Sequence, residues 1–277
     1  MKLKVYSIFA SIDGEVNKLH QGRLSTFIRL HGCNLDCSYC DTKYALSGPH
    51  MELTVDEIVN QVKIMKPKKV TITGGEPLVQ REGVVELIKR LLAEGYGVTV
   101  ETNGSLPLVE RSELFEGVRA VGLEKVVERE TLPQFCWVVD YKLTSSGYNK
   151  RMNMHTFTSL TKDDWIKFVI TSEEDFFEAL NFQRKLKFTY RKVGKGNLIP
   201  NFAYSPAMYL GAKLEYAFNP SALVHLMKEY GDGDEVLNVQ IHKVIMLDEE
   251  VKWHEWCNCQ SRETCEVCRR YKQGDAT

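Results

Sequence analysis

The middle of the chain alternates between two hydrophobic patterns, and this alternation constrains the fold more than any other feature. Short β-branched runs such as 69–73 stop at glycine, as strands do, whereas the apolar residues of 55–62 and 84–92 repeat at helical spacing. Strand, loop and helix in this order favour a parallel sheet wound into a full or partial barrel. Further strands are expected at 98–100, 137–140, 166–170 and 237–241, and further helices at 173–187 and 220–229.

Conspicuous loops follow three of the expected strands, at 74–77, 102–104 and 142–147, and each contains glycine. In a parallel barrel, the loops after the carboxyl ends of the strands carry the chemistry. Thr54 and Glu57 have the spacing of a capping box, which indicates that a helix begins just after Thr54. Residues 105–135 are charged and irregular, and we assign them no role.

The composition limits the classes of function. A length of 277 residues with 43% hydrophobic residues suits one globular domain with at most a small appendage. The net charge of -1 gives no bulk electrostatic reason to expect nucleic-acid or membrane binding. No apolar run is long enough to span a bilayer, and the N-terminus lacks the apolar core of a signal peptide. We therefore expect a cytoplasmic protein.

Three cysteines lie within eight residues, at Cys33, Cys37 and Cys40. Soft thiolates select zinc, copper(I) or an iron–sulfur cluster. A structural zinc site usually has four closed ligands, and no nearby Cys or His supplies a fourth at standard spacing, although His31 is close. Three thiolates on a four-iron cubane leave one iron open, and an open iron can bind S-adenosylmethionine. The cluster is the favoured interpretation, and a structural zinc knuckle is the alternative.

The spacing Cys-x3-Cys-x2-Cys, with Tyr39 just before the third cysteine, resembles the radical S-adenosylmethionine superfamily. The segment 73–77 also resembles the superfamily's Gly-Gly-Glu motif, whose backbone and acidic residue receive the amino group of S-adenosylmethionine. An ordinary glycine turn followed by proline is the alternative for this segment. The resemblance implies a [4Fe-4S] cluster held by Cys33, Cys37 and Cys40, with S-adenosylmethionine as the second cofactor.

A narrower resemblance covers residues 5–245. The segments 27–29, 41–42, 101–104 and 240–243 occur in the order seen in 7-carboxy-7-deazaguanine synthases. These lyases convert 6-carboxy-5,6,7,8-tetrahydropterin to 7-carboxy-7-deazaguanine by radical ring contraction with loss of ammonia, in queuosine-type deazapurine biosynthesis. The resemblance implies an α/β fold, a partial (β/α) barrel of the radical S-adenosylmethionine type with a small Cys-rich C-terminal tail, and a requirement for Mg2+.

The resemblance also assigns residues to roles. It implies contacts with the pterin from Ile12, Asp13, Gly14, Glu15, Arg29 and Thr73, contacts with S-adenosylmethionine from Tyr39, Cys40, Asp41, Gly75, Asp140, Tyr141 and Lys142, and a Mg2+ contact from Thr42.

The chemistry of three of these residues suits the roles. Arg29 offers a bidentate fork for a carboxylate, Glu15 accepts hydrogen bonds from amino and ring N–H groups, and the Thr42 hydroxyl is a hard ligand. Each has a plainer alternative: a surface ion pair, a solvated turn residue and a helix cap, respectively. At Asp13 the sequence departs from the family, which has Gln there, so one substrate hydrogen bond is in question.

Other residues stay outside the expected site. His242 and Lys243 end the expected strand at 237–241, and we interpret them as packing and solvent residues. Cys136 stands apart from both cysteine clusters and is read as a small buried hydrophobic residue.

The C-terminal tail holds the second cysteine cluster, and we divide the chain into a barrel domain at 1–248 and a tail at 249–277. Four thiols in twelve residues suit a closed zinc site, with an auxiliary iron–sulfur cluster or unligated thiols as alternatives. His254 is a substitute ligand. The four thiols belong to Cys257, Cys259, Cys265 and Cys268.

Two other functions compete with the synthase. The first is a radical activase that generates a glycyl radical on a partner enzyme, and the second is a non-catalytic iron–sulfur or zinc-binding protein. For the synthase, the expected partners are the small-molecule pterin and a flavodoxin-like or other reductant, and a homodimer is compatible with the resemblance.

Overall fold

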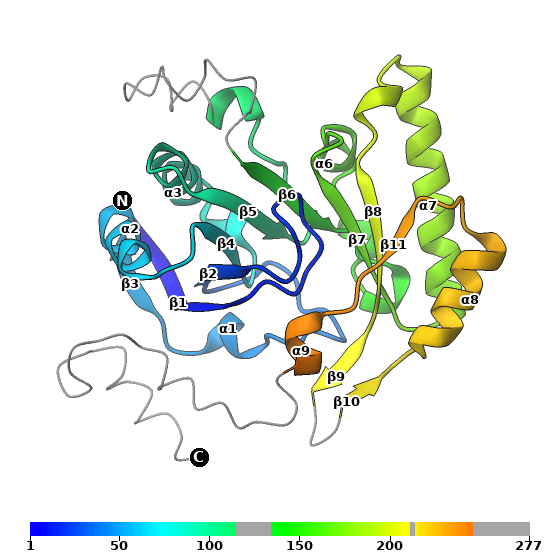
Figure 1. Cartoon of the computed structure of the whole chain (residues 1–277), viewed down its shortest axis with the longest axis horizontal. Coiled ribbons are helices and arrows are strands. Elements are labelled where there is room, and N and C mark those ends of the chain that lie inside the picture. Colours follow the sequence, from blue (N-terminus) through cyan, green and yellow to red (C-terminus); the bar gives the residue numbers. More distant parts are fainter. Residues whose placement is uncertain (115–133, 211–213, 246–277) are drawn as a thin grey trace.

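The computed structural model describes residues 1–114, 134–210 and 214–245 (Figure 1). Part of the irregular stretch 105–135 therefore lies outside the described residues. The same is true of the tail, so the expected metal site there and its four cysteines are not part of the description below. No helix in the described ranges is long and apolar enough to cross a membrane.

The described residues form one nine-stranded sheet in the order β11-β8-β7-β6-β5-β4-β2-β1-β3. In this order, each strand from β11 across to β2 is parallel to its neighbour, whereas β1 is antiparallel to both β2 and β3. Because β3 and β11 remain as edges, the barrel is partial, as expected. The strands are β1 Lys2–Ile12, β2 Leu24–Leu30, β3 Met51–Thr54, β4 Lys69–Gly74, β5 Gly97–Thr102, β6 Phe135–Asp140, β7 Trp165–Ile170, β8 Asn201–Pro206 and β11 Glu235–Leu237.

Helices cover the outside of the curved sheet, with α2 and α3 at one end and α7 and α8 at the other (Figure 1). The short helix α9 instead packs beside β1. A two-stranded hairpin, β9 Met208–Leu210 with β10 Leu214–Tyr216, extends from β8. The helices are α1 Tyr44–Ser47, α2 Val55–Ile64, α3 Arg81–Ala93, α6 Met154–Thr158, α7 Glu173–Lys192, α8 Pro220–Tyr230 and α9 Ile241–Ile245, with 3-10 turns at Pro77–Gln80, Thr144–Ser146, Asn149–Arg151 and Gly196–Leu198.

The core lies between the sheet and its helices. Strands β4, β5 and β6 are buried along nearly their whole length, which is typical of parallel strands covered on both faces. The apolar face of α2 is buried, and the helix contacts α3, β1 and β3. Its N-terminus forms the expected capping box between Thr54 and Glu57.

The expected strands at 69–73, 98–100, 137–140 and 166–170 all form, as do the expected helices, and α7 continues to Lys192. The expected strand at 237–241 is wrong. Strand β11 stops at Leu237, and α9 begins at Ile241. The alternating pattern there has a different cause: Gln240 and His242 line a cavity, so their spacing reflects the site and not a sheet.

Candidate functional site

A cavity of about 210 Å³ lies at the carboxyl ends of the parallel strands. Its wall is built from the ends of β2, β4, β5, β6, β7 and β8, together with the loop after β1 and the start of α9. This is the position at which parallel barrels carry their chemistry. The residues expected in the site that line it are Asp13, Gly14, Glu15, Arg29, Cys33, Cys37, Tyr39, Cys40, Asp41, Thr42, Thr73, Gly75, Asp140 and Lys142.

Two expected site residues do not line the cavity. Ile12 ends β1, where it pairs with Leu24. The ring of Tyr141 stacks on Phe182 with 3.7 Å between ring centroids, and its hydroxyl accepts a hydrogen bond from Asn149 at 3.2 Å. The side chain of Tyr141 therefore belongs to the aromatic core. The expected contact with S-adenosylmethionine would have to come from the Tyr141 backbone.

Cys33, Cys37 and Cys40 face the same cavity as free thiols. Burial raises the pKa of the Cys33 and Cys37 thiols. Three soft thiol ligands that face one cavity suit an iron–sulfur cluster.

A buried charge network crosses the cavity wall. The Lys167 ammonium lies 3.2 Å from a Glu15 oxygen and 3.2 Å from an Asp140 oxygen, and the Lys142 ammonium lies 2.7 Å from the other Asp140 oxygen. Burial would lower the pKa of Lys167, but Asp140 and Glu15 hold it well above its ordinary value. Burial would likewise raise the pKa of Asp140, and the two ammonium groups bring it below its ordinary value. Both lysines therefore stay charged.

Two amide side chains near the C-terminal end of the described chain hold the Glu15 carboxylate. Asn238 donates a hydrogen bond to one of its oxygens at 2.5 Å, and Gln240 donates to the other. Burial acts to raise the pKa of Glu15, but Lys167 and Gln240 outweigh it and lower the pKa. Sequence reasoning missed Lys167, Asn238 and Gln240 as site residues, although Gln240 stands in one of the segments that carry the family resemblance.

Glu101, at the end of β5, is a second cavity carboxyl group that sequence reasoning did not assign. One of its oxygens accepts a hydrogen bond from the Thr73 hydroxyl at 2.7 Å. The other oxygen is buried and has no hydrogen-bond partner among the described residues. Burial and the nearby Glu15 charge raise the pKa of Glu101 to about 7. Near neutral pH it is therefore divided between a carboxylate and a carboxylic acid that can donate a hydrogen bond.

Asp13 is fully buried, and its carboxylate is already paired. One oxygen lies 2.8 Å from the Lys69 ammonium and accepts a hydrogen bond from Thr71, also at 2.8 Å. The other accepts from the backbone N–H of Glu15 at 3.2 Å. Lys69 also donates to Asn17 at 2.8 Å. The Asp13 carboxylate is therefore bonded to other groups of the protein, and the expected contact with the substrate would have to come from another part of Asp13.

The glycine motif after β4 brings two loops into close contact. A Cβ atom on Gly75 would lie 2.0 Å from the carbonyl oxygen of Gly32, just before the first cysteine. Glu76 is turned away from the cavity: its carboxylate accepts hydrogen bonds from the Leu78 N–H, the Thr102 hydroxyl and the Asn103 N–H. The interpretation that Glu76 receives the amino group of S-adenosylmethionine does not fit this position. Glu76 instead joins the loops after β4 and β5.

Helix α9 places His242 and Lys243 at the cavity, in addition to the packing and solvent contacts expected of them. Lys243 forms an ion pair with Asp41 in the cysteine-rich loop. His242 faces Gly14 so closely that a Cβ there would lie 2.1 Å from the His242 Nδ1 atom. Burial lowers the pKa of His242, so its ring is neutral at physiological pH. Position 14 therefore has to be glycine for α9 to close against the loop after β1.

The fold and the three thiols define the class of protein. The family model of the radical SAM superfamily matches residues 27–126. The crystal structure of QueE from Escherichia coli is similar in fold, with a TM-score of 0.58 over 86% of this chain and 94% of that chain, at 16% identity. The chain is a radical S-adenosylmethionine enzyme, a class that binds a [4Fe-4S] cluster and S-adenosylmethionine.

Sequence relatives narrow the class. A 7-carboxy-7-deazaguanine synthase of Clostridium acetobutylicum is 36% identical over 248 residues, which cover 88% of this chain and 96% of that protein. One of Koribacter versatilis is 30% identical over 253 residues, covering 89% and 98% respectively. The chain belongs to the 7-carboxy-7-deazaguanine synthase family, which confirms the family expected from the sequence.

The buried pair of Asp13 and Lys69 predicts a strong effect on stability. Lys69→Met should lower the free energy of unfolding by about 3–5 kcal/mol, because it leaves the Asp13 carboxylate buried without its cation. Adding Asp13→Asn should recover much of this loss. Denaturant unfolding measures both, with Lys63→Met, which breaks an exposed pair with Glu94, as the control. Equal losses in the single and double variants would contradict the pairing.

The raised pKa of Glu101 predicts a dependence of stability on pH. The folded protein keeps a proton that the unfolded chain releases near pH 4.5, so this group stabilises the fold most at low pH. Its contribution to the free energy of unfolding should fall as pH rises from about 4.5 to about 7 and should then level off. Glu101→Gln should lack this component when unfolding is measured across the same range. Identical pH slopes for the two proteins would disprove it.

Proposed function

We propose that this protein is a 7-carboxy-7-deazaguanine synthase, which contracts the ring of 6-carboxy-5,6,7,8-tetrahydropterin with loss of ammonia. The observation that carries the proposal is the position of Arg29 in the same cavity as the three thiols. Among the described residues its guanidinium has no hydrogen-bond or ion-pair partner, and it lies 5.9 Å from the centroids of the Phe9 and Tyr44 rings. Its charge acts on the nearby Asp41 carboxyl group and helps to lower the pKa of that group. An arginine beside a cluster site whose N–H groups are not bonded within the protein is suited to an anionic substrate.

The substrate side of the cavity offers complementary groups. Arg29 would pair with the carboxylate of the pterin, and the fixed Glu15 carboxylate would accept hydrogen bonds from its amino and ring N–H groups. Glu101 adds a group that can accept or donate, next to the Thr73 hydroxyl. The charge of Glu15 is compensated by Lys167, so binding the neutral pterin ring does not bury an isolated anion. Gly14 and the backbone of Asp13 and Ile12 complete the proposed contacts.

The cofactor side is formed by the cysteine loop and the loops after β4 and β6. Cys33, Cys37 and Cys40 would hold the [4Fe-4S] cluster, which supplies the electron that cleaves S-adenosylmethionine to a radical. Around it, the paired charges of Asp140 and Lys142 offer one acceptor and one donor in fixed positions. The residues proposed to contact S-adenosylmethionine are Tyr39, Cys40, Asp41, Gly75, Asp140, Lys142 and the backbone of Tyr141.

Thr42 is proposed as a magnesium ligand. Thr42 lines the cavity, and its hydroxyl lies 3.7 Å from the Cys40 sulfur, which supports a role beside the proposed cluster. Magnesium prefers a few protein oxygens, with substrate and water completing its shell. A single hydroxyl is enough for that role when the pterin carboxylate supplies another oxygen.

The tail at 249–277 is proposed as a separate zinc-binding unit attached to the barrel domain at 1–248. Cys257, Cys259, Cys265 and Cys268 supply the four thiolates of a closed tetrahedral site. Metal analysis should find about one zinc per chain beside the four irons, and a Cys257→Ser, Cys259→Ser variant should lose the zinc alone. Eight irons without zinc would indicate an auxiliary cluster instead.

A cluster that must be reduced requires an electron donor, for which we propose a flavodoxin-like protein or another reductant. We propose a cytoplasmic location, and a homodimer is compatible with the proposal. The test of the function is anaerobic reconstitution with iron and sulfide, followed by incubation with the tetrahydropterin, S-adenosylmethionine, magnesium and a reductant. The deazapurine chromophore should appear without net consumption of S-adenosylmethionine. Cleavage of S-adenosylmethionine without deazapurine would favour the activase alternative.

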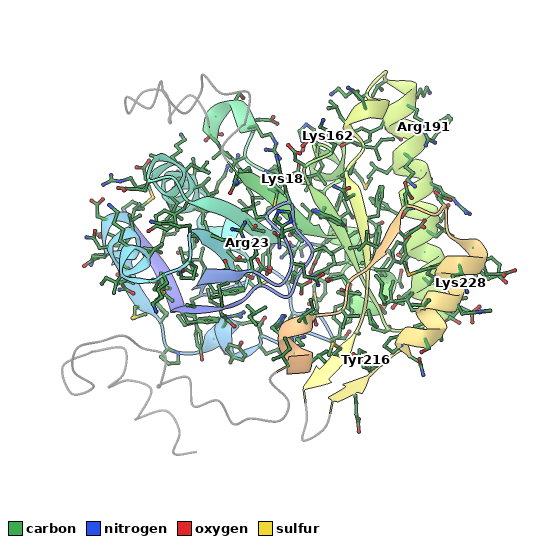
Figure 2. All side chains as sticks on the ribbon, in the orientation of Figure 1. Lys18, Arg23, Lys162, Arg191, Tyr216 and Lys228 are labelled. Atoms are coloured by element: carbon green, nitrogen blue, oxygen red, sulfur yellow. The ribbon has the colours of Figure 1, made fainter. Side chains whose placement is uncertain are left out.

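If Arg29 anchors the substrate, its removal should weaken binding of the pterin selectively. Arg29→Ala should weaken apparent pterin binding by about 2–5 kcal/mol, because it removes a charge-assisted pair to a partly buried carboxylate, and should change S-adenosylmethionine binding far less. Steady-state kinetics with each substrate varied in turn separates the two effects. Arg191→Ala is the matched control, since Arg191 lies on the outer end of α7 (Figure 2). An unchanged apparent affinity for the pterin would refute the assignment.

A further inference from the structure

Asn103, in the loop after β5, directs an N–H group at the first cysteine of the cluster loop. Its side-chain nitrogen lies 3.7 Å from the Cys33 sulfur and 3.0 Å from the Asn34 side-chain oxygen. The backbone N–H of Leu35 also donates to the Cys33 sulfur, at 3.4 Å. Asn103 is 7% exposed, so water competes little for this donor.

The orientation of the Asn103 amide is determined by its neighbours. Its oxygen accepts hydrogen bonds from the Ser105 backbone N–H at 3.0 Å and from the Ser105 hydroxyl at 2.6 Å. A backbone N–H can only donate, so the oxygen has to face Ser105 and the NH2 group has to face Cys33. The reverse amide orientation would place two donors together at Ser105 and an acceptor against the sulfur.

Two further contacts keep this loop in position. Asn34 donates to the Ser105 hydroxyl at 2.8 Å, which closes a ring of hydrogen bonds through Asn103, Asn34 and Ser105. The backbone N–H of Asn103 donates to the buried Glu76 carboxylate at 2.7 Å. The donor is thus fixed before any cluster binds.

We propose that Asn103 is a positioning residue that tunes the cluster by donating a hydrogen bond to the Cys33 thiolate, an inference that rests on the proposed function. Reduction adds negative charge to the cluster and its thiolates, so a hydrogen bond donated to a thiolate stabilises the reduced state more than the oxidised state. Asn103 therefore raises the reduction potential and makes the cluster easier to reduce.

The test is an anaerobic redox titration of the reconstituted protein, followed by the electron paramagnetic resonance signal of the reduced cluster. Asn103→Leu removes the donor and keeps a similar volume. At a fixed ambient potential, the ratio of reduced to oxidised cluster should fall about fivefold, as expected for one net hydrogen bond. For a one-electron couple this corresponds to a shift of about 40 mV to more negative potential.

Thr102→Val is the matched control, because it removes a hydrogen bond to Glu76 from the neighbouring residue, the last of β5, without touching a sulfur. It should leave the potential at the parent value. Asn103→Ala, which is smaller, should shift the potential in the same direction as Asn103→Leu. Equal potentials for Asn103→Leu, Thr102→Val and the parent would overturn the inference, as would a loss of iron binding in both Asn103 variants, which would assign Asn103 to cluster assembly. A parent protein that binds no four-iron cluster would instead refute the proposed function.

Discussion

The two ion pairs of the buried Lys167 ammonium group are the interactions on which the rest of the site depends. Lys167 extends from β7 and reaches Glu15, in the loop after β1, and Asp140, at the end of β6. A buried ammonium ion is tolerated only when it is paired and hydrogen-bonded, and here one partner, Glu15, is buried and the other, Asp140, is partly buried. Asp140 in turn holds Lys142. Removing Asp140 leaves Lys142 without an ion-pair partner, and removing Lys167 leaves Glu15 without one, so Lys167 and Asp140 hold the network together.

This network gives the cavity a wall drawn from both ends of the described chain. Glu15 comes from the first connection of the sheet, and the amides of Asn238 and Gln240 come from the segment between β11 and α9. Lys243 then pairs with Asp41, in the loop that carries the three thiols. The partial barrel has open edges, so these side-chain contacts, and not strand pairing, hold the N-terminal loop and α9 together over the cavity.

The sequence predicted those parts of the molecule whose signals are local. Periodicity marked the buried strands and amphipathic helices, and spacing marked Cys33 and its partners. The partners of Lys167 could not be predicted in this way, because they lie on separate strands and loops and meet only once the strands are aligned. The same limit explains the wrong strand at 237–241. Side chains directed alternately at a cavity give the same alternation as a half-buried strand, and Asn238 and Gln240 are directed at Glu15.

Asp13 and Glu15 show how two carboxylates only two positions apart come to have different uses. Asp13 turns inward, where Lys69 neutralises it and Thr71 donates to it. Glu15 faces the cavity, and its own backbone N–H donates to Asp13, so the inward carboxylate shapes the turn that presents the outward one. An acidic residue at position 13 is therefore compatible with a substrate that carries a carboxylate. Lys69 balances its charge beneath the loop. The pterin would therefore contact the turn that Asp13 stabilises and would not contact the Asp13 carboxylate itself.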